Sequence, residues 1–277
     1  METSWSSLKK SLRRLSKDWV YSLVGDEAYG VIGWNAGKKG PFTLTGWLTK
    51  RRALRTRPTE DFAEAAEQSV ATTTALKNYL SEKDGAELTI RTFGFPKLPV
   101  RLRSGQFFGK SGPPGLGVPL FTFAHPDGGR FGAVLRQNRR PDSSAVALSD
   151  DLRDAGLPGS EVAFWEALDY RFSDDEWTVS GGWWLDFAED EDTLVERLLT
   201  GAGYLKKQSL SAFLNLDNLP EDAEEWTLAR FFEANLTDTE VVTLRYFCAG
   251  ESWFVHYLMG QTPSGDMLGL QTVSFTF

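Results

Sequence analysis

The chain has 277 residues, of which 41% are hydrophobic, 13% aromatic and 25% charged; this composition excludes a disordered or fibrous protein, and the length favours two domains over one large core. No apolar run approaches the roughly 20 residues that cross a membrane, and residues 1–19 carry charge where an export signal needs an apolar core, so we expect a cytoplasmic protein with no membrane partner. The single cysteine excludes an intrachain disulfide. Together with only two histidines it is too little for a standard zinc site, so no cofactor or metal is predicted.

The formal net charge of −8 conceals an asymmetry between the halves of the chain. Residues 1–138 contain 21 Lys and Arg against 12 Asp and Glu, a net charge of +9. Residues 139–277 contain 9 against 26, a net charge of −17. A basic half joined to an acidic half points to charged partners or to mutual docking of the halves.

The first predicted element is an amphipathic helix over residues 6–23. Trp5, Leu8, Leu12 and Leu15 recur at helical spacing, and lysines and arginines cover the opposite face. Two readings stay open. The basic face lies on a membrane or a phosphate backbone, or it is the solvated face of a helix packed on the protein.

Strands and one further helix follow in the first half. We predict strands over residues 28–34, 42–47, 87–93, 99–103, 118–124 and 131–136, with a helix over 61–80 that Thr59 caps. A basic cluster in a predicted loop is a candidate phosphate-binding site for nucleic acid: Lys50, Arg51, Arg52, Arg55 and Arg57. It lacks interleaved aromatic residues and a glycine-rich cradle. Residues 139–147 are polar, contain a proline and form the predicted linker between domains.

The second half alternates helices and strands in a similar way. Ser149 and Ser160 cap two predicted helices, the second ending near Tyr170. A strand is expected over residues 179–187, a helix over 190–199, a strand or short helix over 210–216 and a helix over 221–236. Strands over 241–247, 253–259 and 268–277 complete the chain, the last two joined by a turn over 260–265.

The two halves share local patterns. The predicted turn at Pro126, Gly128 and Gly132 matches Pro263, Gly265 and Gly269 at an offset of 137 residues. Residues 20–34 match 170–184 at an offset of 150, and both segments end on tryptophan. Two copies of one unit, 1–138 and 148–277, are the simplest account.

The second copy resembles the nuclease A inhibitor family, whose members block non-specific DNA/RNA endonucleases. The resemblance is carried by the closing pattern of Gly260, Thr262, Pro263, Gly265, Gly269 and Thr272, and by an acidic turn of Ser173, Asp174, Asp175, Glu176 and Trp177 before a strand with Trp184. It implies an α+β or α/β fold of two similar domains. In each, a mostly antiparallel sheet is packed by helices in an α/β/α sandwich.

The resemblance also implies which residues bind the nuclease. Family members are thought to plug the nuclease with an acid of this turn, here Asp174, and to reach its catalytic divalent metal with the end of the chain, here Thr276 and Phe277. The family ends in a hydroxyl residue and this chain in Phe277, so Thr276 or the terminal carboxylate would contact the metal. The first copy has Val24 in place of the acid, which predicts that it has lost this mode of inhibition.

Three hypotheses follow. The first is a non-enzymatic inhibitor whose acidic second domain mimics phosphate and binds a nuclease through Asp174, Asp175, Glu176, Trp177, Thr262, Thr276 and Phe277. The second is a metal-dependent hydrolase that uses the three acids. The third is an interaction or nucleic-acid-binding module that retains the fold without inhibition. We predict the first hypothesis, with the third as the alternative. If the acidic turn has no binding role, its three acids are simply the solvated residues of a turn.

Overall fold

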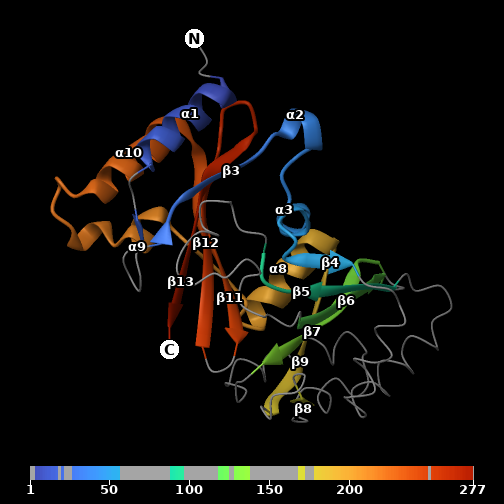
Figure 1. The fold of residues 1–277 in the computed structure, drawn as a ribbon. Coiled ribbons are helices and arrows are strands. Elements are labelled where there is room, and N and C mark those ends of the chain that lie inside the picture. Colours follow the sequence, from blue (N-terminus) through green and yellow to red (C-terminus); the bar gives the residue numbers. More distant parts are fainter. Residues whose placement is uncertain are drawn as a thin grey trace. The chain divides into compact units, whose positions relative to one another are not determined.

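A computed structural model describes residues 4–17, 20–21, 27–56, 88–96, 118–124, 128–137, 168–171, 178–248 and 251–276. The chain forms two compact units (Figure 1). Unit 1 comprises Met1–Trp47, Lys97–Gly115 and Leu205–Phe277, and unit 2 comprises Leu48–Pro96 and Leu116–Tyr204. Both are built on antiparallel sheets with helices, so the fold class is α+β.

Unit 1 contains a five-stranded sheet in the order β10-β11-β12-β13-β3 and a small β1-β2 pair. Its elements are α1 (Trp5–Leu15), β1 (Val20–Tyr21), β2 (Glu27–Ala28), β3 (Gly30–Trp34), α2 (Ala36–Lys39), β10 (Leu205–Gln208), α9 (Leu210–Leu214), the 3-10 helix η2 (Leu216–Asn218), α10 (Glu224–Asn235), β11 (Thr237–Cys248), β12 (Glu251–Gln261) and β13 (Met267–Thr276). The chain passes into unit 2 within α3 (Leu44–Lys50).

Unit 2 contains a six-stranded sheet in the order β4-β5-β6-β7-β9-β8. Its elements are β4 (Leu54–Thr56), β5 (Leu88–Phe93), β6 (Val118–Ala124), β7 (Arg130–Gln137), β8 (Leu168–Arg171), β9 (Thr178–Ala188) and α8 (Glu191–Gly201). The Asp190 side chain caps α8 by accepting from the amide of Thr193 at 2.9 Å. Leucines of α8 are fully buried, among them Leu194 and Leu198.

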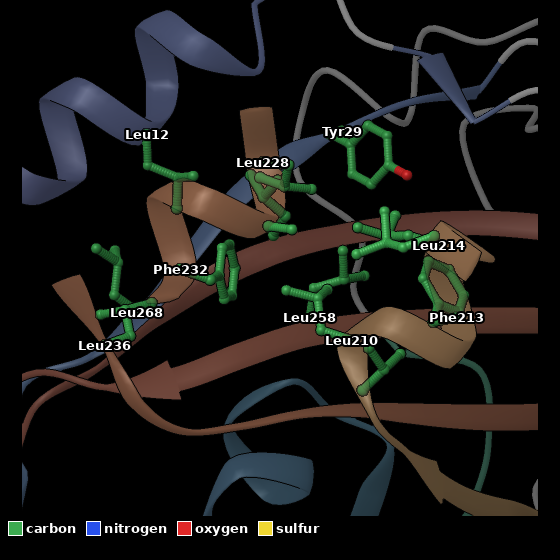
Figure 2. Close-up of a cluster of buried hydrophobic side chains, with 14 of the residues drawn as sticks. Leu12, Tyr29, Leu210, Phe213, Leu214, Leu228, Phe232, Leu236, Leu258 and Leu268 are labelled. Carbon is green, nitrogen blue, oxygen red and sulfur yellow. The ribbon is translucent and has the colours of Figure 1, made fainter. Parts of the chain in front are cut away.

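The core of unit 1 lies between one face of its sheet and the helices α1, α9 and α10 (Figure 2). Leu12 of α1 is completely buried, as are Leu228 of α10 and Leu258 of β12. Burying one such side chain contributes about 1.5–3 kcal/mol. The apolar side of the basic helix is therefore packed on the protein, as the second of the two predictions for this helix requires. Its basic side is exposed at Lys10, Arg13, Arg14 and Lys17.

The opposite face of the same sheet also contacts a helical residue. Tyr257 neighbours Leu258 on β12 and therefore points to the other face. It meets Trp47 of α3 edge to face, with ring centroids 5.7 Å apart. Helical side chains thus contact both faces of the unit 1 sheet.

The hairpins β6–β7 and β12–β13 share one register, as the predicted offset of 137 requires. Leu120 pairs with Val134, and Tyr257 pairs with Gln271. In both turns a glycine has positive φ, 99° at Gly128 and 79° at Gly265, which side chains with a Cβ rarely adopt.

A second glycine is shared by the two hairpins. At Gly132 and Gly269, a Cβ would collide with the carbonyl oxygen of Phe121 and of Leu258 in the paired strand. The glycines of the closing pattern therefore have a structural cause.

Several element predictions were wrong. Residues 42–47 were expected to be a strand, but Leu44–Lys50 is helical, since the Thr43 hydroxyl accepts from the amide of Gly46 at 3.1 Å and Leu44, Trp47 and Leu48 are buried at helical spacing. The first helix ends at Leu15 and not near residue 23. Residues 168–171 form β8, although a helix was predicted to reach Tyr170. The helix predicted over 61–80 and the strand over 99–103 lie outside the described residues.

The compact units do not follow the predicted division into residues 1–138 and 148–277. β3, from the first half, pairs with β13 from the second, and β9, from the second half, pairs with β7 from the first (Figure 1). Periodicity identifies strands but contains no signal for which sheet edge a strand joins. The predicted linker at 139–147 lies outside the described residues.

Candidate functional site

The turn of the closing hairpin is the predicted site element that the structure describes most fully. The hydroxyl of Thr262 accepts from the Asp266 amide at 3.1 Å and lies 3.0 Å from the Ser264 hydroxyl. The Thr262 amide donates to the Asp266 carbonyl at 2.7 Å, and the Gly265 amide donates to the Thr262 carbonyl at 2.8 Å. Thr262 is only 3% exposed, so its hydroxyl is engaged within the turn.

Asp266 connects this turn to the first half of the chain. Its Oδ1 accepts from the Ala36 amide at the start of α2 at 2.7 Å, and its Oδ2 accepts from the Ser264 hydroxyl at 3.1 Å. The carboxylate is 6% exposed, and buried carboxylates persist where hydrogen bonds satisfy them. Sequence reasoning missed Asp266, since its partner is 230 positions away.

An open groove of about 820 Å³ adjoins the turn in unit 1. Apolar residues from α2, the segment after it and β13 line it, together with the polar start of β11: Ala36, Gly37, Pro41, Phe42, Asp238, Thr239, Glu240, Gln261, Gly265 and Met267. Asp238 has φ 48° at an irregularity in the β11–β12 register. Glu240 lies 3.7 Å from Lys207 of β10. The lining of the groove therefore combines apolar residues with acidic residues of β11.

The end of β13 is held in the sheet. Ser252 pairs with Thr276, and Trp253 pairs with Phe275. This places the backbone of Thr276, a predicted contact residue, on the last pair of the ladder. Phe277 lies outside the described residues.

A buried polar cluster crosses the three long strands of unit 1. His256 Nδ1 lies 2.9 Å from the Thr243 hydroxyl of β11, and Nε2 lies 2.8 Å from the Ser274 hydroxyl of β13. Burial lowers the pKa of His256 from 6.5 to about 4, because the charged form loses hydration. Phe213 and Phe254 lie against the ring. The arrangement resembles a serine–histidine pair, but the third group is a hydroxyl and not the carboxylate that orients a catalytic histidine.

The predicted acidic turn lies between two paired strands in the sequence. β8 and β9 pair as far as Arg171 and Thr178, and Asp174, Asp175, Glu176 and Trp177 fall between these strands in the chain, outside the described residues. Trp184, which ends the opening pattern of the resemblance, is 6% exposed on β9.

The basic cluster spans the end of α3, the following turn and β4 in the chain. Lys50, Arg52 and Arg55 are exposed, and Arg55 Nε donates to the Arg52 carbonyl at 3.1 Å. Cations at a helix C-terminus complement its dipole. Arg57 lies outside the described residues.

Within the described part of the chain, no three His, Cys, Asp or Glu side chains group as metal ligands. No helix there is long and apolar enough to cross a membrane. No family model, curated protein or solved structure matches the chain.

Proposed function

We propose that the chain is a protein-binding inhibitor that resembles nuclease A inhibitors, with its acidic half blocking the active site of a non-specific nuclease as a phosphate mimic. The closing hairpin carries the proposal. Gly265 supplies the positive φ of the turn, Gly269 the close approach to Leu258, and Thr262 the hydrogen bonds across the turn. Three members of the pattern thus have a structural task, which is a stronger basis for a resemblance than composition alone.

Electrostatics supports the same proposal. A nuclease cleft is built for phosphates and holds an oxygen-preferring divalent metal. A half-chain with net charge −17 is attracted to such a cleft, and Asp174, Asp175 and Glu176 supply three adjacent carboxylates.

Titration of the intact protein into a panel of non-specific nucleases tests the proposal. We expect stoichiometric loss of DNA hydrolysis for at least one nuclease, and an inhibition constant at least tenfold weaker for Asp174→Asn. Asp222→Asn removes the same charge from an exposed residue of the acidic half and should leave inhibition unchanged. No inhibition at micromolar concentrations, or equal effects of the two substitutions, would refute the proposal. Mg²⁺-dependent phosphodiester hydrolysis by the chain alone would support the hydrolase hypothesis instead.

The second candidate function, a nucleic-acid-binding module, is favoured by the exposed side chains of Lys50, Arg52 and Arg55. It predicts a DNA mobility shift that weakens steeply with salt. Arg52→Gln with Arg55→Gln should abolish the shift. Lys206→Gln with Arg230→Gln removes two other exposed cations and serves as control. An absent or salt-insensitive shift excludes this function.

A further inference from the structure

The two large sheets share one strand order. Reading from one edge, β10-β11-β12-β13-β3 corresponds to β4-β5-β6-β7-β9, with β8 added outside β9. In both, the first four strands follow one another in the chain, and the fifth comes from elsewhere.

The correspondence extends to residue pairs. Leu54 pairs with Phe93 at the start of β4, and Leu205 pairs with Leu244 at the start of β10. Each residue of the second pair therefore lies 151 positions after its counterpart in the first pair. The two hairpins correspond at a uniform offset of 137. A one-residue slip would move every side chain to the opposite face, so agreement over several strands is specific.

The turns that lead into β4 and β10 match as well. The amide of Ala53 donates to the carbonyl of Leu48, and that of Tyr204 donates to Leu199, both at 2.8 Å. The residue before each donor has positive φ, 59° at Arg52 and 82° at Gly203. These positions are again 151 apart. The helices that precede the turns, α3 and α8, therefore end with the same C-terminal motif.

The fifth strand breaks the pattern of chain order. β3 precedes β4 in the chain, yet it pairs with β13, where Val31 faces Leu270. β9 precedes β10, yet it pairs with β7, where Leu185 faces Ala133. Leu270 and Ala133 are equivalent at the hairpin offset of 137. Each half therefore supplies the fifth strand of the other half's sheet.

We infer that the chain is a duplicated unit whose two copies have exchanged their opening strands, so that each half is the binding partner of the other. The edge of β13 binds the β3 segment of the first copy, and the edge of β7 binds the β9 segment of the second. Exchange of equivalent elements costs little free energy, because each strand finds the same kind of edge in either sheet. The inference holds whatever the chain binds.

Cysteine pairs separate exchanged from unexchanged copies. Paired Cα atoms of antiparallel strands lie about 4.5–5.5 Å apart, within disulfide range. In a Cys248→Ser background, we would introduce Val31→Cys with Leu270→Cys, and Ala133→Cys with Leu185→Cys. The matched controls recombine the same four substitutions as Val31→Cys with Ala133→Cys, and Leu185→Cys with Leu270→Cys.

We expect oxidation to cross-link the first two variants within single chains, seen by peptide mass spectrometry, and to leave the recombined variants reduced. Cross-links in the recombined variants, or disulfide-linked dimers of the first two, would overturn the inference. If a variant does not fold, NMR of the unsubstituted protein still tests the inference. Amide NOEs between β3 and β13 support exchange, whereas NOEs between β3 and β7 refute it.

Discussion

The two sheets carry opposite chemistry at positions that their registers make equivalent. In unit 2, the carboxylate of Glu191 at the start of α8 forms an ion pair with Arg91 of β5 and lies 3.5 Å from Arg130 of β7. The hydroxyl of Thr122 on β6, fully buried, donates to the same carboxylate at 3.3 Å. A charged network therefore joins β5, β6 and β7 to the N-terminus of α8.

The equivalent row in unit 1 is apolar. Val242 of β11, Met259 of β12 and Met267 of β13 correspond to Arg91, Thr122 and Arg130, and they are 1%, 1% and 7% exposed. The strand pairing thus accommodates either charged or apolar side chains at these positions. What it requires is that partly buried charges come as a complete set, since a missing partner leaves an uncompensated charge.

The largest effect should come from the glycines that both sheets share. In Gly269→Ala the new Cβ collides with the Leu258 carbonyl oxygen, a backbone atom that cannot move without breaking the ladder. We expect a loss of about 3 kcal/mol in the free energy of unfolding, measured by urea denaturation. Gly132→Ala should cost less, because its Cβ lies 2.7 Å from the Phe121 carbonyl oxygen.

Gly37→Ala is the control for this pair, because Gly37 is exposed in α2 and its Cβ would have only the Asn35 side chain nearby, at 3.8 Å. Its stability should match the parent or exceed it slightly. Tolerance of alanine at position 269 would contradict the shared structural role of the two glycines.

A second difference between the sheets is pH dependence. The strand position equivalent to His256 is Pro119 in β6, so the buried imidazole has no counterpart at that position of the unit 2 sheet. The pKa of His256 is about 4 in the folded chain against 6.5. Between these values the unfolded chain binds an extra proton, so stability is full above pH 6.5 and falls as the pH is lowered towards 4.

We expect this group to account for roughly 2–3 kcal/mol across that window. Urea denaturation at pH 7, 6, 5 and 4 measures this change. His256→Gln keeps groups able to hydrogen-bond to Thr243 and Ser274, and it should show a correspondingly shallower dependence. Equal pH slopes for the two proteins would contradict the assignment.

The charged network offers a smaller but more selective test. Glu191→Gln leaves Arg91 and Arg130 without their counter-charge, and partial exposure of the network limits the expected loss to about 1–2 kcal/mol. Replacing the network with the chemistry of unit 1, by Arg91→Val, Thr122→Met, Arg130→Met and Glu191→Gln together, should restore most of that loss. A fourfold variant less stable than Glu191→Gln would show that the two rows are not interchangeable.

Local elements were predictable where periodicity and residue propensity favoured the same structure. The spacing of Leu8 and Leu12 identified the packed face of α1, and the Gly-x-Thr-Pro-x-Gly pattern identified the closing turn. The segment at 42–47 was misread because its aromatic and β-branched residues favour a strand, whereas the helical spacing of Leu44, Trp47 and Leu48 decided the outcome.

Long-range relations were not predictable from one sequence. The pairing of β3 with β13 and the bond from Asp266 to Ala36 each join residues more than 200 positions apart. The cluster around His256 had one usable signal, since Thr243, His256 and Ser274 are polar residues within predicted strands. Their alignment depends on register, which the alternation of side chains does not determine between strands.

The smallest effect concerns the turns into β4 and β10. Arg52 adopts φ 59° where its equivalent is Gly203 at 82°, and a left-handed conformation costs a residue with a Cβ about 1 kcal/mol. Arg52→Gly should therefore raise the free energy of unfolding by about 0.5 kcal/mol, after the greater entropy of glycine in the unfolded chain is deducted. Gly203→Arg should lower it by a similar amount. Changes of the same sign at both positions, measured by urea denaturation, would show that the two turns are not equivalent.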